Sequence, residues 1–247
     1  MMYEKRQVVL FKNRKKTKKI DAVVVETGLK IFLNGKKLFT LLCSPENLDY
    51  LAKGIAFSSG IVKRKEEIKS LLIKDSCCYL ETTVPVKLCE RMISSGCGGT
   101  VNFFRKIEKN KNTNFKISAR EIFCLMDEFQ KLAKVYRLTG GVHCAGISDG
   151  ERIMSFHEDI GRHNALDKVI GECFSKDISV SNKIILSSGR ISSEITLKAA
   201  TVGIPVIVSR SAPTTYAIRL ARLFDITLVG FVRGKRMNIY TSSRRIF

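Results

Sequence analysis

A glycine-rich segment, residues 94–100, holds the cysteine whose neighbours most favour chemistry. Cys97 lies between Gly96 and Gly98, in a stretch of residues too small to build a core. Glycine permits positive φ and lets backbone amides approach a ligand or a thiolate closely. Successive amides in such a turn can bind an anion, which lowers the pKa of a thiol. Two interpretations stay open: a reactive thiol, or a cysteine that happens to lie in a loop.

The other cysteines are scattered, and no pair has the C-x-x-C spacing of zinc sites or thioredoxin-like motifs. Eight cysteines in 247 residues are too few for a disulfide scaffold, so most are expected to be reduced and buried. A zinc deaminase is rejected, because His143-Cys144-Ala145 has no adjacent glutamate and residues 211–214 contain no cysteine. No metal site is predicted.

Two loops combine hydroxyl groups with an arginine where α/β proteins bind phosphates. Residues 187–190 (SSGR) follow an apolar strand and precede a helix, and residues 209–214 (SRSAPT) repeat this arrangement one strand later. Strand ends and helix N-termini coincide at such loops, so backbone amides point toward an anion there. Together the two loops predict a cradle for a phosphorylated ligand.

A basic turn near the C-terminus is a further candidate for phosphate binding. It consists of Phe231, Val232, Arg233, Gly234, Lys235 and Arg236, with three cations around a glycine. Arginine binds phosphate oxygens through charge-assisted, often bidentate hydrogen bonds. A charged hairpin tip in solvent explains the same composition, and the residue types alone leave both interpretations open.

Polar residues gather in residues 158–164 (EDIGRHN), immediately before an apolar helix. Glu158 and Asp159 are placed to orient Arg162 or His163, and the asparagine is placed to cap the helix. A surface loop whose polar groups satisfy one another is the alternative interpretation.

Two parts of the chain must position these residues. The first part, residues 1–92, is predicted to form a smaller β-rich domain. Its short strands are rich in valine, isoleucine and phenylalanine, and Asn34-Gly35 predicts a two-residue hairpin turn. Ser44 followed by Pro45 predicts the start of a helix, with the serine as N-cap.

Residues 93–247 are predicted to form the second domain. Ser118 and Glu121 have capping-box spacing at the start of a helix that is expected to end at Gly140. Strand and helix patterns then alternate to the C-terminus. This alternation favours an α/β fold with a largely parallel sheet and helices on its faces.

The chain is strongly basic, with 43 Lys and Arg against 23 Asp and Glu and a net charge of +20. Such a field attracts nucleic acid, phosphorylated cofactors, acidic proteins or anionic lipid, without choosing among them. Solvation alone is an alternative explanation, above all for the lysine-rich residues 12–19. No apolar run reaches the roughly 18 residues of a membrane span, and no secretion leader is recognised, so a cytoplasmic protein is expected.

Several motifs together resemble the formate dehydrogenase accessory sulfurtransferase family, FdhD/NarQ. They are residues 139–143 (TGGVH), 158–171 (EDIGRHNALDKVIG), 188–192 (SGRIS), 203–205 (GIP), 211–214 (SAPT) and 230–241 (GFVRGKRMNIYT), with looser matches at residues 34–35, 44–48 and 54–60. The match covers most of the chain, and the motif at residues 158–171 is highly specific.

The resemblance implies a fold, a cargo and partners. The fold would be a cytidine-deaminase-like three-layer α/β core without zinc, joined to the β-rich N-terminal domain. Cys97 would take persulfide sulfur from a cysteine desulfurase and pass it to a molybdenum or tungsten bis-molybdopterin guanine dinucleotide cofactor, carried as bound substrate for a formate dehydrogenase. Residues 231–236 would bind this cofactor, and the protein would be a homodimer.

One position departs from the family pattern. Better-known bacterial members have a C-x-x-C pair in the cysteine loop, whereas Ser94 occupies the first of those positions here. A single accessible thiolate can still accept and pass on a persulfide, although it forms no disulfide within the loop. Cations would neutralise the pyrophosphates, with His143 or His163 as candidate proton sources; the cations are Arg190, Arg210, Arg233, Lys235 and Arg236.

Three functions are compatible with these observations. The first is a sulfurtransferase that uses Cys97. The second is a chaperone that binds the molybdenum cofactor while Cys97 is passive. The third is a nucleic-acid-binding protein, which the net charge suggests; against it, the chain has no recognised nucleic-acid motif and no aromatic stacking platform. The expected partners are therefore proteins and a pterin cofactor, with neither membrane nor nucleic acid.

Overall fold

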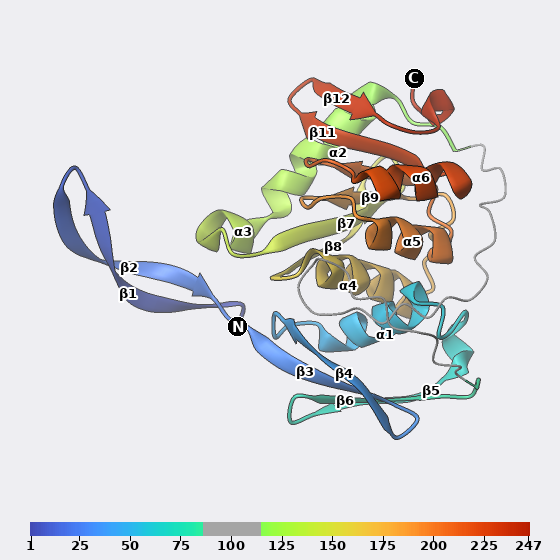
Figure 1. Cartoon of the computed structure of the whole chain (residues 1–247), viewed down its shortest axis with the longest axis horizontal. Helices are drawn as coiled ribbons and strands as arrows, with labels where there is room; N and C mark the ends of the chain where they lie inside the picture. Colours follow the sequence, from blue (N-terminus) through green and yellow to red (C-terminus); the bar gives the residue numbers. More distant parts are fainter. Residues whose placement is uncertain (86–114) are drawn as a thin grey trace.

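The computed structural model describes residues 1–85 and 115–247. Within these ranges the chain forms a six-stranded sheet covered by helices, a four-stranded sheet beside it, and a two-stranded hairpin that projects away from both (Figure 1). None of the helices in the described ranges is long and apolar enough to cross a membrane.

The six-stranded sheet is mixed. Its strand order is β12 (Arg236–Ile239), β11 (Thr227–Arg233), β10 (Val206–Ser209), β9 (Ile184–Ser187), β7 (His143–Ser148) and β8 (Ile153–Asp159). The three central strands β9, β10 and β11 are parallel, whereas β12, β7 and β8 pair antiparallel with their neighbours. The prediction of a largely parallel sheet was therefore wrong at both edges. Short turns join β7 to β8 and β11 to β12, and such turns connect only antiparallel strands.

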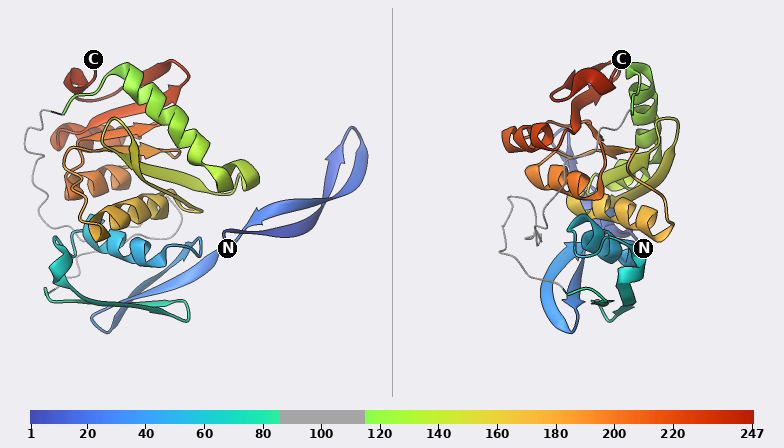
Figure 2. Two further views of the ribbon diagram at one scale, coloured as in Figure 1. Left: turned by 180° about the vertical axis from the view of Figure 1, so that it is seen from behind. Right: turned by 90° about the vertical axis from the view of Figure 1, so that its right-hand side faces the viewer.

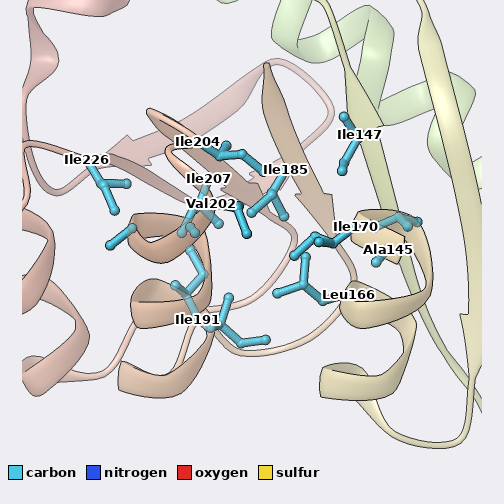
Figure 3. Packing of buried hydrophobic residues seen from close by; sticks show 14 of the residues in the cluster. Ala145, Ile147, Leu166, Ile170, Ile185, Ile191, Val202, Ile204, Ile207 and Ile226 are labelled. Atoms are coloured by element: carbon cyan, nitrogen blue, oxygen red, sulfur yellow. The ribbon is translucent and has the colours of Figure 1, made fainter. Parts of the chain in front are cut away.

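Helices cover both faces of this sheet, which confirms an α/β fold with three layers. One face carries α2 (Ala119–Leu132) and α3 (Lys134–Thr139); the other carries α4 (Arg162–Ser175), α5 (Ser193–Val202) and α6 (Thr215–Leu223) (Figure 2). Successive strand residues point to opposite faces. Ile185 and Ile207 accordingly pack toward α4 and α5, as Figure 3 shows, whereas Ile184 and Val206 pack toward α2.

The four-stranded sheet is built from the N-terminal part of the chain. Its order is β4 (Lys36–Cys43), β3 (Thr27–Leu33), β6 (Cys77–Thr82) and β5 (Ile68–Lys74), and a short 3-10 helix η1 (Lys65–Glu67) precedes β5. The hairpin predicted at Asn34-Gly35 is confirmed. Both residues have positive φ, at 48° and 76°, as the type I′ turn of a two-residue hairpin requires. The buried side chains of this sheet pack against α1 (Leu48–Ser58).

The helices α1 and α4 join the two sheets in direct backbone contact. A Cβ atom added at Gly54 on α1 would lie 1.8 Å from the carbonyl oxygen of Asp167, and one added at Gly171 on α4 would lie 1.9 Å from the carbonyl oxygen of Tyr50. Only glycine at both positions permits this approach. The domain boundary predicted between residues 92 and 93 lies outside the described residues and stays a prediction.

One predicted helix start was wrong, and one predicted helix is divided in two, although its predicted end at Gly140 is confirmed. The helix α1 begins at Leu48 after Asn47, which has a left-handed φ of 56°, and not at Ser44. Ser44 instead bonds to the end of β8 and the residue that follows it: its N–H donates to the Asp159 carboxylate, and its hydroxyl accepts from the Ile160 N–H. The capping box of Ser118 is confirmed, but the helix that it starts is interrupted at Ala133, and α3 continues to Thr139.

The projecting hairpin consists of β1 (Tyr3–Lys12) and β2 (Lys15–Val24), and we call it the arm. The lysine-rich residues 12–19 form its tip and the beginning of its second strand, so they are not an unstructured tail. At the other end of the chain, a 3-10 turn η2 (Ser243–Arg245) buries the Arg245 guanidinium, which donates to Asp225 and Thr227.

Candidate functional site

The three loops that were predicted to bind phosphate meet at the carboxyl ends of β9, β10 and β11. The Arg210 N–H donates to the Ser187 carbonyl at 3.2 Å, which ties the loop after β10 to the loop after β9. The Phe231 N–H donates to the Ser211 carbonyl at 3.1 Å, which ties β11 to the same loop. The sequence placed these loops far apart along the chain, and the sheet brings them side by side.

A cavity of about 310 Å³ opens beside these loops. Its wall contains three arginines from three different elements, Arg137, Arg210 and Arg233. The remaining lining residues are aromatic, small or neutral; they are Phe129, Gln130, Ala133, Tyr136, Cys144, Ser188 and Ser211. The described lining therefore has cations and no carboxylate.

Arg210 has an incomplete set of partners. Its Nε is buried, and among the described residues no group accepts a hydrogen bond from it. No carboxylate of the described ranges lies within ion-pair distance of Arg210 or Arg233. An unsatisfied buried donor costs free energy, and an anion in the cavity would remove that cost. The cavity therefore suits a phosphate-bearing or otherwise anionic ligand.

The break between α2 and α3 adds a wall to the cavity that was not predicted from the sequence. The turn at Ala133 allows α3 to bring Tyr136 and Arg137 to the cavity. The Glu158 carboxylate fixes α3 by accepting from the Val135 N–H at 2.9 Å and the Tyr136 N–H at 2.8 Å. No local signal in the sequence distinguishes Arg137 from other helical arginines, because its position depends on Glu158, a residue of β8.

Ser188 connects the cavity to the histidine beside it. Its Oγ accepts from the Cys144 N–H at 2.9 Å and lies 3.3 Å from His143 Nδ1. Burial, followed by the nearby Arg162 and Arg190 guanidinium groups, lowers the pKa of His143. The imidazole is therefore neutral at pH 7 and can hold a single ring proton toward Ser188 or toward the ligand.

Cys144 is a second thiol at the cavity, and its chemistry differs from that expected of Cys97. It is 2% exposed, and burial together with the Glu158 carboxylate raises its pKa strongly. A thiol of this kind stays protonated at neutral pH and is a poor nucleophile. Cys97 itself lies between residues 86 and 114, outside the described residues, so its assignment stays a prediction.

The polar segment at residues 158–164 has a structural role that the sequence analysis did not assign. Asp159 pairs with Lys168 at 2.6 Å rather than with Arg162 or His163. Asn164 does not cap α4, which begins at Arg162; its side-chain amide donates to the Leu42 carbonyl and to Asp159.

His163 has a different partner, on α5. Its Nε2 lies 3.3 Å from Glu194 and 3.2 Å from the Ser192 hydroxyl, and all three groups are at the N-terminal ends of α4 and α5. Burial is the largest cause that lowers the pKa of His163, to about 4. His163 is thus neutral, and it belongs to a buried cluster that does not line the arginine cavity.

The basic turn at residues 231–236 is divided between two environments. Arg233 lines the cavity, and the Val232 side chain is buried in the sheet. Gly234 and Lys235 are exposed in the turn that joins β11 to β12, and Arg236 is exposed at the start of β12. The structure thus places one residue of the six in the cavity wall, and binding by the other five stays a prediction.

These features define an α/β protein with an arginine-lined cavity at the carboxyl edge of its sheet, and comparisons with known proteins agree on its family. A model of the FdhD/NarQ family matches residues 24–247. The chain is 41% identical to the "Sulfur carrier protein FdhD" of Staphylococcus haemolyticus, over 92% of this chain and 90% of that protein. It is 39% identical to the protein of the same name from Staphylococcus aureus, over 97% and 94% of the two chains. The chain belongs to the FdhD/NarQ family.

A solved structure extends this similarity to the fold. A protein from Desulfotalea psychrophila, described as a candidate formate dehydrogenase accessory protein, superposes with a TM-score of 0.83 at 25% sequence identity, over the full length of both chains.

Proposed function

We propose that this protein is a sulfur carrier for the maturation of a formate dehydrogenase. It takes sulfur from a cysteine desulfurase on Cys97 and delivers it to a molybdenum or tungsten bis-molybdopterin guanine dinucleotide, which it holds as bound substrate. The observation that carries this proposal is the arginine-lined cavity, with the buried and unsatisfied Nε of Arg210, in a member of the FdhD/NarQ family. The names of the Staphylococcus relatives support the sulfur-carrier role.

The loading step is thiol–persulfide exchange. The Cys97 thiolate attacks the outer sulfur of the donor's persulfide, a new S–S bond forms at Cys97, and the donor's S–S bond breaks to release its cysteine as a thiolate. No oxidant is required, since the sulfane sulfur only changes its partner. This attack requires an accessible thiolate, and the small glycine neighbours of Cys97 in the sequence are compatible with that requirement.

The cavity would hold an anionic part of the substrate. Arg137, Arg210 and Arg233 would neutralise phosphate oxygens, and the Ser188 hydroxyl would donate or accept a neutral hydrogen bond. The volume of about 310 Å³ is at the lower end for ligand pockets, so it accommodates one part of a dinucleotide and not the whole. A homodimer, which we also propose, would supply two such cavities to one bis-pterin molecule.

The strand arrangement supports a cytidine-deaminase-like core that works without zinc. An antiparallel β7–β8 hairpin precedes three parallel strands, with helices α4 and α5 beginning at the same sheet edge. A zinc deaminase has a glutamate two residues after its ligand and a C-x-x-C pair on the next helix. Here His163 is followed by Asn164 and Ala165, and α5 contains no cysteine.

Mass spectrometry tests the loading step directly. After incubation with a cysteine desulfurase and cysteine, the protein should gain about 32 Da, one sulfur atom, on the peptide that contains Cys97. The adduct should be absent from Cys97→Ala and present in Cys124→Ala, because Cys124 is an exposed cysteine on α2 that has no assigned role. An unchanged adduct in Cys97→Ala would exclude the assignment.

Complementation separates transfer from chaperoning. In cells that lack the native protein, Cys97→Ser should fail to restore formate dehydrogenase activity while still binding the pterin dinucleotide. Full restoration by Cys97→Ser would instead identify a chaperone that carries the cofactor without transferring sulfur.

A further inference from the structure

The arm extends well beyond the body of the protein. Its base is held where the Val25 N–H donates to the Met2 carbonyl at 2.9 Å, and where Val24 packs against Gly141. From there its ten-residue strands pair with each other, and no third strand from the described residues joins them. Figures 1 and 2 show the arm pointing away from both sheets. Ten residues at the usual rise per strand residue give each strand a length of about 30 Å.

The arm exposes more apolar surface than an isolated hairpin tolerates. Val9, Phe11 and Ile20 lie on one face and are 62%, 65% and 60% exposed, whereas Leu10 and Val23 lie on the other at 42% and 44%. A two-stranded hairpin is at best marginally stable in water without a further packing partner. Its outer edges also offer unpaired backbone groups, which readily pair with a strand of another protein. The arm is therefore suited to be covered by a partner.

The charge of the arm indicates which kind of partner this is. Residues 7–20 contain six lysines and arginines and no aspartate or glutamate. The arm of a second copy carries the same positive charge, so two arms would repel each other and would not cover one another. A membrane surface covers one face only, whereas this arm has apolar residues on both faces. An acidic protein surface matches the charge and the apolar residues together.

The position of the arm relates that partner to the cavity. The base of β2 contacts α3, and α3 contributes Tyr136 and Arg137 to the cavity wall. We propose that the arm docks the acidic enzyme that receives the cargo of the cavity, which under the proposed function is the formate dehydrogenase catalytic subunit. The family model matches residues 24–247, so nearly all of the arm lies outside the segment that this model describes. This inference rests on the proposed function for the identity of the enzyme, but not for the existence of the contact.

Charge reversal in the full-length protein tests the proposal. Lys15, Lys16, Lys18 and Lys19 are replaced together by glutamate, and the control replaces four exposed lysines of the four-stranded sheet, Lys30, Lys36, Lys37 and Lys74. Binding to the purified formate dehydrogenase catalytic subunit is measured at low and raised salt. The arm variant should raise Kd by about tenfold or more and bind with a weaker salt dependence, while the control stays close to wild type. A second variant, Val9→Thr with Phe11→Thr, should weaken binding without changing the salt dependence.

Each other outcome overturns the proposal. Equal losses in the arm variant and the control would show that only the net charge matters, and unchanged binding in the arm variant would show that the arm is not used. Binding to anionic lipid vesicles or to transfer RNA that is lost in the arm variant, with normal enzyme binding, would assign the arm to a membrane or to RNA.

The proposed function is tested separately, by measuring whether polysulfide loads sulfur onto Cys97 in the same variants. The arm variant should load normally. Failure of wild-type loading would contradict the proposed function, while the docking measurement would still be made with the unloaded protein.

Discussion

Two regions of this protein concentrate cations, and the regions differ in whether carboxylates neutralise those cations. Beneath α1, Lys168 and Lys198 are almost fully buried, and each contacts a carboxylate, at 2.6 Å from Asp159 and at 2.7 Å from Asp167. At the cavity, Arg210 has no carboxylate partner within the described parts of the chain, and its Nε is unsatisfied. The first region resolves its charges internally, whereas the second leaves a positive charge for a ligand.

The buried pairs also specify how three helices fit together. Lys198 on α5 donates to Asp167 on α4 and to the Ser58 hydroxyl on α1, and that hydroxyl donates to Asp167. Lys168 donates in the same manner to the Ser44 carbonyl. Burying an ion pair brings little net stability, but separating one of its members from the other is costly. These contacts therefore select one register of α1 on α4. The cavity depends on the six-stranded sheet, whereas the contacts that fix these helices lie outside the cavity.

The largest expected effect is on the backbone contact between α1 and α4. Gly54→Ala should lower the free energy of unfolding by more than about 3 kcal/mol, because the new methyl group overlaps the Asp167 carbonyl and the helices must separate. Chemical denaturation measures this change. Gly28→Ala is the control, since a Cβ there has its nearest neighbour at 3.8 Å. Similar stability of the two variants would show that the helices are not in contact.

Next in size is the removal of one partner from a buried pair. Lys198→Met should cost about 3–5 kcal/mol, because it leaves the Asp167 carboxylate buried without a counter-ion. Adding Asp167→Leu should recover much of this loss, since both charges are then absent. The control Lys69→Met removes an exposed pair with Glu81 and should change stability by less than about 1 kcal/mol. A double variant no more stable than Lys198→Met would contradict this account.

Substitution of a cavity arginine should have the opposite effect: ligand binding should be lost while the stability of the fold stays unchanged. Arg210→Ala should weaken the binding of a pterin guanine dinucleotide by about tenfold or more, which corresponds to a charged hydrogen bond of about 1.5–3 kcal/mol. Its melting temperature should stay at or above that of the wild type, because an unsatisfied buried donor has been removed. Arg222→Ala, an exposed change on α6, is the control for charge. Normal binding by Arg210→Ala would remove the cavity from the site.

The smallest expected effect is a pH dependence from His163. Its pKa lies near 4 in the folded protein and near 6.5 in the unfolded chain, so between these values the unfolded state binds the extra proton. Stability from this group is complete above pH 6.5 and is lost as the pH falls toward 4, by at least about 1 kcal/mol. Denaturation midpoints across this range should flatten in His163→Gln. They should keep part of their slope, since the pKa values of His143 and His157 are also lowered.

Local patterns in the sequence predicted most of the elements of this fold correctly. The Asn34-Gly35 turn, the capping box at Ser118 and the strand–helix alternation of residues 142–241 all depend on neighbours within a few residues. The errors came where distant partners decide the outcome. Ser44 has the residue type of an N-cap, yet its hydroxyl accepts from Ile160, a residue more than a hundred positions away. The mixed sheet was missed because strand direction depends on how the edge hairpins pair.

The candidate site divides in the same way. The sequence by itself determined the loops that bear hydroxyl groups and arginines, since strand–loop–helix patterns and residue types are local properties. Only the tertiary structure decided that Arg137 joins Arg210 and Arg233, because that requires α3 to be anchored by Glu158. It also decided which cations are paired. Whether a lysine or arginine stabilises the fold or awaits a ligand depends on a carboxylate that folding brings close, and no local pattern encodes that distance.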